Sequence, residues 1–124
     1  MKTLFKLTFL LLIGSCSSKT SEYKIVDSVT TGYQLQASVF TIDTNSVKMK
    51  EFSKSFVEKN KKPKLKRYTI GFFCRLDKAP KFLPNGQPTG IDLGELTKFL
   101  IGYYSYDVEM DKVSFESYPE RLIK

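Results

Sequence analysis

A chain of 124 residues has room for one domain, and its composition is that of a folded protein rather than a disordered tail. Ten Phe and seven Tyr bring the aromatic content to 14%, and apolar residues reach 41%, enough for a hydrophobic core. Basic residues outnumber acidic ones by 20 to 13, and there is no His. The lack of His removes the usual general base, the catalytic systems that pair His with Ser or Cys, and the commonest metal ligand.

The N-terminal segment differs from the rest of the chain. Lys2 and Lys6 give it positive charge, and an almost unbroken apolar run follows from Leu7 to Ile13. Small residues then lead to Cys16. The run is far shorter than the ~20 residues that a membrane-spanning helix needs, and it lacks the polar face that a helix packed on a core would show. The pattern predicts a secretory signal over residues 1–15.

The end of this segment, Ile13-Gly14-Ser15-Cys16, resembles the lipobox of bacterial lipoproteins, although Leu is commoner at the place of Ile13. The resemblance covers only the leader. It implies that residues 1–15 are removed, that Cys16 is acylated, and that the chain is held to the lipid bilayer of the cell envelope. Ser17 rather than Asp follows the Cys, which in bacteria with two membranes resembles the signal for the outer membrane.

Acylation of Cys16 would occupy one of the two cysteines of the chain. It leaves Cys74 without an intramolecular partner, so a disulfide scaffold is not expected. The residues that follow the lipidated Cys are mostly small and polar, so we expect residues 16–22 to be the lipidated Cys and a short tether, in which residues 17–21 span only ~20 Å when fully extended. The single domain, residues 23–124, should therefore lie close to the lipid surface.

Two segments rich in β-branched and aromatic residues, 23–29 and 33–42, are predicted to form a hairpin with Gly32 at its turn. In the second segment apolar side chains alternate with polar ones, as in a half-buried strand. The alternation places four side chains on the inner face: Tyr33, Leu35, Ala37 and Val39.

A helix is predicted next, because residues 43–46 offer several N-caps and apolar residues then recur at helical spacing. The spaced residues are Met49, Phe52 and Phe56. Asn60 and Pro63 are predicted to end this helix.

Residues 68–76 make the clearest strand, with one face formed by Tyr68, Ile70, Phe72, Cys74 and Leu76. Phe73 points the other way, which indicates that the second face is partly covered too. We interpret Cys74 as a buried core residue, because no neighbour on the strand would stabilise a thiolate.

A turn-rich loop over residues 80–90 precedes a second predicted helix, which Asp92 and Glu95 open as a capping box. Its apolar stripe is Leu93, Leu96, Leu100 and Tyr103. Residues 104–110 and 113–118 are predicted to form a last hairpin. This order predicts an α+β fold, a small two-layer sandwich with a mostly antiparallel sheet and one or two helices on one face. The expected core contains Phe52, Phe56, Ile70, Phe72, Leu96 and Leu100.

The acidic residues do not form a convincing site. Asp107, Glu109 and Asp111 alternate like the start of a calcium-binding loop, but Lys112 stands where that loop needs Gly and Tyr118 where it needs Glu. We interpret the three acids as the solvated face of a strand, whose other face carries Tyr106, Val108 and Met110; a weak cation site is the alternative. No catalytic residue, metal site or cofactor is predicted.

The remaining feature is a cluster of six cations within residues 59–67: Lys59, Lys61, Lys62, Lys64, Lys66 and Arg67. Such a run can bind anionic lipid, an acidic glycan or an acidic protein, and the alternative is a solvated loop whose charges aid solubility. Nucleic acid is not expected as a partner, because the chain is predicted to be exported and the run lacks stacking aromatics beyond Tyr68.

These patterns favour a non-enzymatic envelope lipoprotein whose domain binds a protein or an anionic surface. An inhibitor or immunity-type lipoprotein that blocks one toxin or enzyme is the alternative. A small hydrolase that uses carboxylates alone ranks last, because no pair of acids can be argued to share a cleft.

Overall fold

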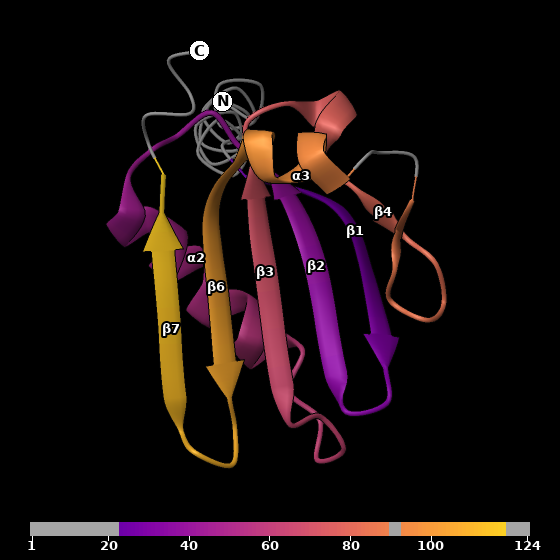
Figure 1. The fold of residues 1–124 in the computed structure, drawn as a ribbon. Helices are drawn as coiled ribbons and strands as arrows, with labels where there is room; N and C mark the ends of the chain where they lie inside the picture. The colour runs from indigo at the N-terminus through magenta and orange to yellow at the C-terminus, as the bar shows by residue number, and fades with distance from the viewer. Residues whose placement is uncertain (1–22, 90–92, 119–124) are drawn as a thin grey trace, which may run out of the picture.

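The computed structural model describes residues 23–89 and 93–118. Five strands form one sheet in the order β1-β2-β3-β6-β7, and the pairing is antiparallel except between β2 and β3 (Figure 1). The bounds are β1 (Lys24–Thr31), β2 (Gln34–Phe40), β3 (Arg67–Phe73), β6 (Leu100–Asp107) and β7 (Lys112–Ser117). The predicted α+β fold with a mostly antiparallel sheet is confirmed.

Helix α2 (Ser46–Lys59) makes the crossover that the parallel pair β2 and β3 requires. Asn45 is the N-cap, since its side-chain Oδ1 accepts hydrogen bonds from the backbone N–H groups of Val47 at 3.0 Å and Lys48 at 3.1 Å. Asn60 is the C-cap, where the sequence predicted the helix to end.

The main core lies between α2 and one face of the sheet. Met49 of α2 and Ile70 and Phe72 of β3 are fully buried, and Phe56 is 7% exposed. Phe52 is half-buried and its ring stacks on that of Tyr23, with centroids 5.1 Å apart. Four of the six predicted core residues therefore lie in this core or pack against it.

The first hairpin forms as predicted around Gly32, whose φ of 56° suits a residue without Cβ. Leu35, Ala37 and Val39 are buried against the core. Tyr33 does not join them, because it stands in the turn before β2 begins and is 67% exposed.

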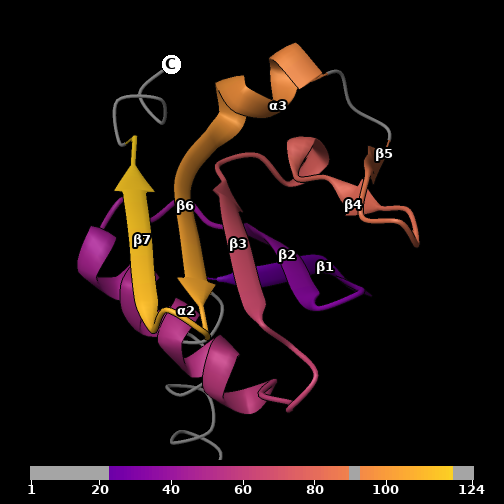
Figure 2. The same cartoon turned by 60° about the horizontal axis from the view of Figure 1, so that its bottom comes forward.

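The other face of the sheet, here called the open face, is partly covered by the segment between β3 and β6 (Figure 2). This segment, here called the roof, comprises residues 74–89 and 93–99. It contains η1 (Leu76–Lys78), β4 (Lys81–Phe82), β5 (Pro88–Thr89) and α3 (Leu93–Phe99). Helix α2 and the roof thus lie on opposite sides of the sheet, and α2 covers the core face.

Two predicted boundaries next to the roof are wrong. The third strand ends at Phe73 rather than Leu76, and Leu76 is 47% exposed in η1 because the chain turns away from the sheet there. The second helix ends at Phe99, so Leu100 and Tyr103 lie on strand β6, where pairing with β3 outweighs their helical spacing. Leu96 and Leu100 line the roof side of the sheet instead of the core beneath α2.

The last hairpin also forms, but its strands begin and end earlier than predicted. Residues 108–111 form the turn, in which Asp111 has a φ of 49°. Met110 is 71% exposed in that turn, so its predicted inward position is wrong. None of the helices within residues 23–89 and 93–118 has the length and apolar content needed to span a bilayer.

Candidate functional site

The six Lys and Arg side chains of residues 59–67, which form the predicted contact surface, lie at one end of the sheet. This end of the sheet, with its six cations, is here called the basic end. The backbone N–H groups of Lys66 and Arg67 donate to the carbonyl oxygen of Tyr33 at 2.7 and 3.1 Å. The N–H of Val108 donates to the carbonyl oxygen of Lys66 at 2.9 Å. The basic end therefore lies between the β1–β2 turn and the β6–β7 turn, at the bottom of the sheet in Figure 1. All six cations are exposed.

An apolar anchor holds this loop against the domain. Leu65 is only 3% exposed and belongs to the core cluster, although it stands between two exposed lysines. The hydroxyl of Tyr68 accepts a hydrogen bond from the backbone N–H of Lys62 at 3.4 Å. With Pro63 and Val108 these residues line a shallow hollow of about 270 Å³. The lysines around it are thus presented on a fixed backbone.

Carboxylates neutralise two of the six cations. Lys61 lies 3.3 Å from Glu58, and Arg67 lies 3.3 Å from Asp107. The remaining four, Lys59, Lys62, Lys64 and Lys66, have no ion pair with any residue in the described part of the chain. The basic end therefore keeps a cluster of four uncompensated positive charges, which favours contact with anions.

The acidic residues of the β6–β7 hairpin are engaged in local structure. Asp107 accepts hydrogen bonds from the backbone N–H of Met110 and from Arg67, which hold the pKa of its carboxyl below its usual value. Asp111 accepts a 2.8 Å hydrogen bond from the hydroxyl of Tyr106 and thereby raises the pKa of that tyrosine. Glu109 and Asp111 stand in the turn rather than on the wet face of a strand. No group of three potential metal ligands occurs among the residues that the structure describes.

Cys74 was predicted to be buried in the core, and it is half-buried instead. It packs against the core cluster just beyond the end of β3, and its backbone N–H donates to the carbonyl oxygen of Phe99 at 3.1 Å. Cys16 and Asp92, the predicted lipidation site and helix cap, lie outside the described residues.

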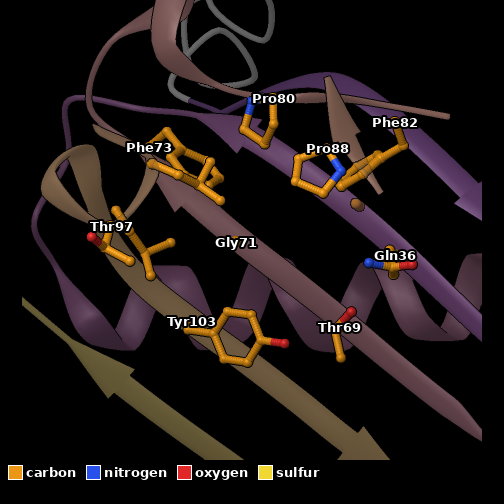
Figure 3. A pocket seen from close by; sticks show the side chains of 12 residues that line it. Gln36, Thr69, Gly71, Phe73, Pro80, Phe82, Pro88, Thr97 and Tyr103 are labelled. Carbon is orange, nitrogen blue, oxygen red and sulfur yellow. The ribbon is translucent and has the colours of Figure 1, made fainter. Parts of the chain in front are cut away.

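A second feature was not predicted: a pocket of about 200 Å³ between the open face and the roof (Figure 3). Strands β2, β3 and β6 supply its floor, and β4, β5 and α3 supply its cover. The lining is mostly apolar, with Phe73, Pro80, Phe82, Pro88, Leu96 and Leu100 as its larger apolar members.

Side chains of β1 and β2 fix the roof above this pocket. The Asp27 carboxylate accepts a hydrogen bond from the backbone N–H of Phe82 at 2.8 Å. The buried Ser38 hydroxyl donates to the carbonyl oxygen of Pro80 at 2.5 Å, and the Gln36 amide donates to that of Gly86 at 3.4 Å. These contacts join residues that are 42 to 55 positions apart in the sequence, so they cannot be predicted from any local sequence pattern. In the sequence, the turn-rich loop over residues 80–90 was the one feature that pointed to this part of the fold.

No protein-family model, no curated protein and no solved structure matches this chain.

Proposed function

We propose that this chain is the precursor of a bacterial envelope lipoprotein whose domain is a non-catalytic binding module for an anionic partner. The lipobox-like Ile13–Cys16 segment supports the anchor. Strand β1 begins at Lys24, so an anchor at Cys16 would hold the domain near the lipid surface.

The basic end and the start of the domain lie at opposite ends of the sheet, and this observation carries our proposal for the side on which the partner binds. Lys24 at the start of β1 pairs with Phe40, whereas Thr31 at its end pairs with Gln34, which in turn pairs with Arg67. Eight residues of strand at ~3.3 Å each separate the two ends by roughly 25 Å.

This distance bears on which anionic surface the lysines contact. Attraction between charges is screened over about 8 Å at physiological salt, far less than the length of the sheet. With the sheet upright on its tether, the basic end points away from the bilayer that holds Cys16. We therefore propose that the partner is an acidic protein surface facing the domain from the far side, rather than the lipid head groups next to the anchor.

The test compares two variants with the same loss of charge. In the first, the four unpaired lysines of the basic end are changed to Gln: Lys59, Lys62, Lys64 and Lys66. In the matched control, four exposed lysines elsewhere are changed to Gln: Lys24, Lys54, Lys81 and Lys98. Each lipidated protein is immobilised in neutral nanodiscs and exposed to envelope extract, and separately to anionic vesicles, at low and high salt.

We expect the wild-type protein and the control to retain an acidic protein in a salt-sensitive manner. The basic-end variant should lose at least about tenfold in retention, since each lysine near an anionic surface contributes ~1 kcal/mol. Equal retention by both variants would show that total charge, rather than the basic end, governs binding. Retention of anionic vesicles but of no protein would assign the basic end to lipid.

The anchor is tested separately through Cys16. The intact mass of the mature protein should show a lipid-modified N-terminal Cys, and Cys16→Ser should release the protein from membranes or stall its maturation. A Cys16→Ser protein that matures and remains with the membrane fraction as before would refute the lipoprotein assignment.

A further inference from the structure

The roof is longer than the connection between its two strands requires. Strands β3 and β6 are antiparallel neighbours, and such strands can be joined by a two-residue turn. The chain instead leaves the sheet at Cys74 and returns at Leu100. The roof covers part of the open face and encloses the pocket described above.

The pocket is held in shape by hydrogen bonds rather than formed around a ligand. Asp27, Gln36 and Ser38 each bind a backbone group of the roof from the sheet below. Phe73 in the floor is only 4% exposed. A ligand that binds to a preformed pocket does not pay the entropic cost of ordering the roof. Most small-molecule sites in proteins are largely preformed in this way.

The lining selects against charge. Among the residues that the structure describes, none that lines the pocket carries a charge at neutral pH, in contrast to the hollow at the basic end. A charged ligand would lose hydration there without gaining a counter-ion. The volume of about 200 Å³ suits one ring, since a dry apolar cavity of ~150 Å³ accepts benzene.

Gly71 allows close packing in the floor of the pocket. A Cβ at this position would lie 2.9 Å from the Phe73 ring and 3.4 Å from the Leu100 side chain. The missing side chain lets the Phe73 ring and the Leu100 side chain lie close to the strand, and these two side chains form the apolar wall of the pocket near Gly71 (Figure 3).

Two hydroxyl groups give the mouth of the pocket a polar edge. Figure 3 shows Tyr103 of β6 and Thr69 of β3 with their oxygens at the same side of the pocket. The Tyr103 side chain is 42% exposed, and its hydroxyl makes no hydrogen bond with any residue that the structure describes. The Thr69 oxygen accepts from the Gln34 amide at 3.3 Å, which leaves its proton to donate.

From these observations we propose that the pocket binds a small, uncharged, ring-sized molecule that places an apolar ring against Phe73 and Leu100 and a polar substituent beside Tyr103 and Thr69. This site is separate from the basic end and does not depend on lipidation of Cys16. The chemistry fits a phenol-like or benzyl-alcohol-like ligand rather than an organic acid.

The test uses the whole chain held in lipid nanodiscs, with phenol as the neutral probe and benzoate as the charged probe of equal ring size. Amide NMR shifts of Gly71, Leu100 and Tyr103 report binding, and empty nanodiscs correct for partitioning of the probe into lipid. We expect phenol to bind with a Kd of roughly a millimolar or below and benzoate to bind about tenfold more weakly. Nuclear Overhauser effects between phenol and the Leu100 methyl groups should place the ring without any variant.

Variants separate this pocket from general stickiness. Leu96→Trp should fill the pocket from α3 and abolish the phenol shifts, whereas Leu83→Trp adds the same ring at a position that does not line the pocket and should leave them. Tyr103→Phe should weaken phenol several-fold and leave toluene unchanged, because only phenol uses the hydroxyl. Absence of shifts with phenol, equal affinity for benzoate, or persistence of the shifts in Leu96→Trp would overturn the proposal.

Discussion

The side chain of Phe72 offers the sharpest test of the core. It lies on β3, the middle strand of the sheet, and is fully buried. Its ring makes edge contacts with those of Tyr23 and Phe52, each with centroids 6.0 Å apart. Truncation of a buried Phe to Ala costs about 3–5 kcal/mol, and the loss of two edge contacts of ~0.5–1.5 kcal/mol each places Phe72→Ala at the upper end of that range.

Urea unfolding followed by circular dichroism measures this cost, because a domain of this size has a total stability of only about 5–15 kcal/mol. Phe115→Ala is the matched control, since it removes the same atoms from a half-buried site on the edge strand β7. We expect the control to lose less than half as much stability. A loss below ~1 kcal/mol for Phe72→Ala, or equal losses for both variants, would mean that β3 is not the centre of the core.

Two further predictions concern close packing and charge. Gly102→Ala should destabilise the fold by about 1–3 kcal/mol in the same unfolding assay, because its Cβ would lie 2.8 Å from the sulfur of the buried Met49; an unchanged stability would refute this contact. The pKa of Asp107, followed by carboxyl NMR, should lie below 3.8 and rise towards it in Arg67→Gln. Because the pKa is lowered in the folded state, the stabilising contribution of this carboxylate is present above the unfolded pKa and is lost as pH falls through the folded value.

Local signals in the sequence were sufficient for several elements. The cap residues and the spacing of Met49 and Phe56 predicted α2, and alternation predicted the buried face of β2 and β3. Strand β6 was partly missed, since Leu96, Leu100 and Tyr103 are spaced as on a helix while the chain changes from helix to strand after Phe99. Only the long-range pairing with β3 decides that boundary.

The two candidate sites differ in how far the sequence could predict them. The cluster of cations was visible as a run of Lys and Arg, and its exposure followed from charge alone. The position of this cluster, at the end of the sheet far from Tyr23, depends on the directions of the strands, which composition does not encode. The pocket was invisible, because Asp27 and Ser38 act on backbone groups far along the chain and resemble ordinary strand residues.

The parallel pairing of β2 with β3 also has a consequence for the order in which the domain folds. The outer hairpins β1–β2 and β6–β7 join strands that are neighbours in sequence. In contrast, the segment that contains α2 separates β3 from β2 in the sequence, and the roof separates β3 from β6. Loop closure delays such distant pairings, so we expect the two hairpins to form early and β3 to join them late. Substitutions in β3 such as Phe72→Ala should then speed unfolding far more than they slow folding.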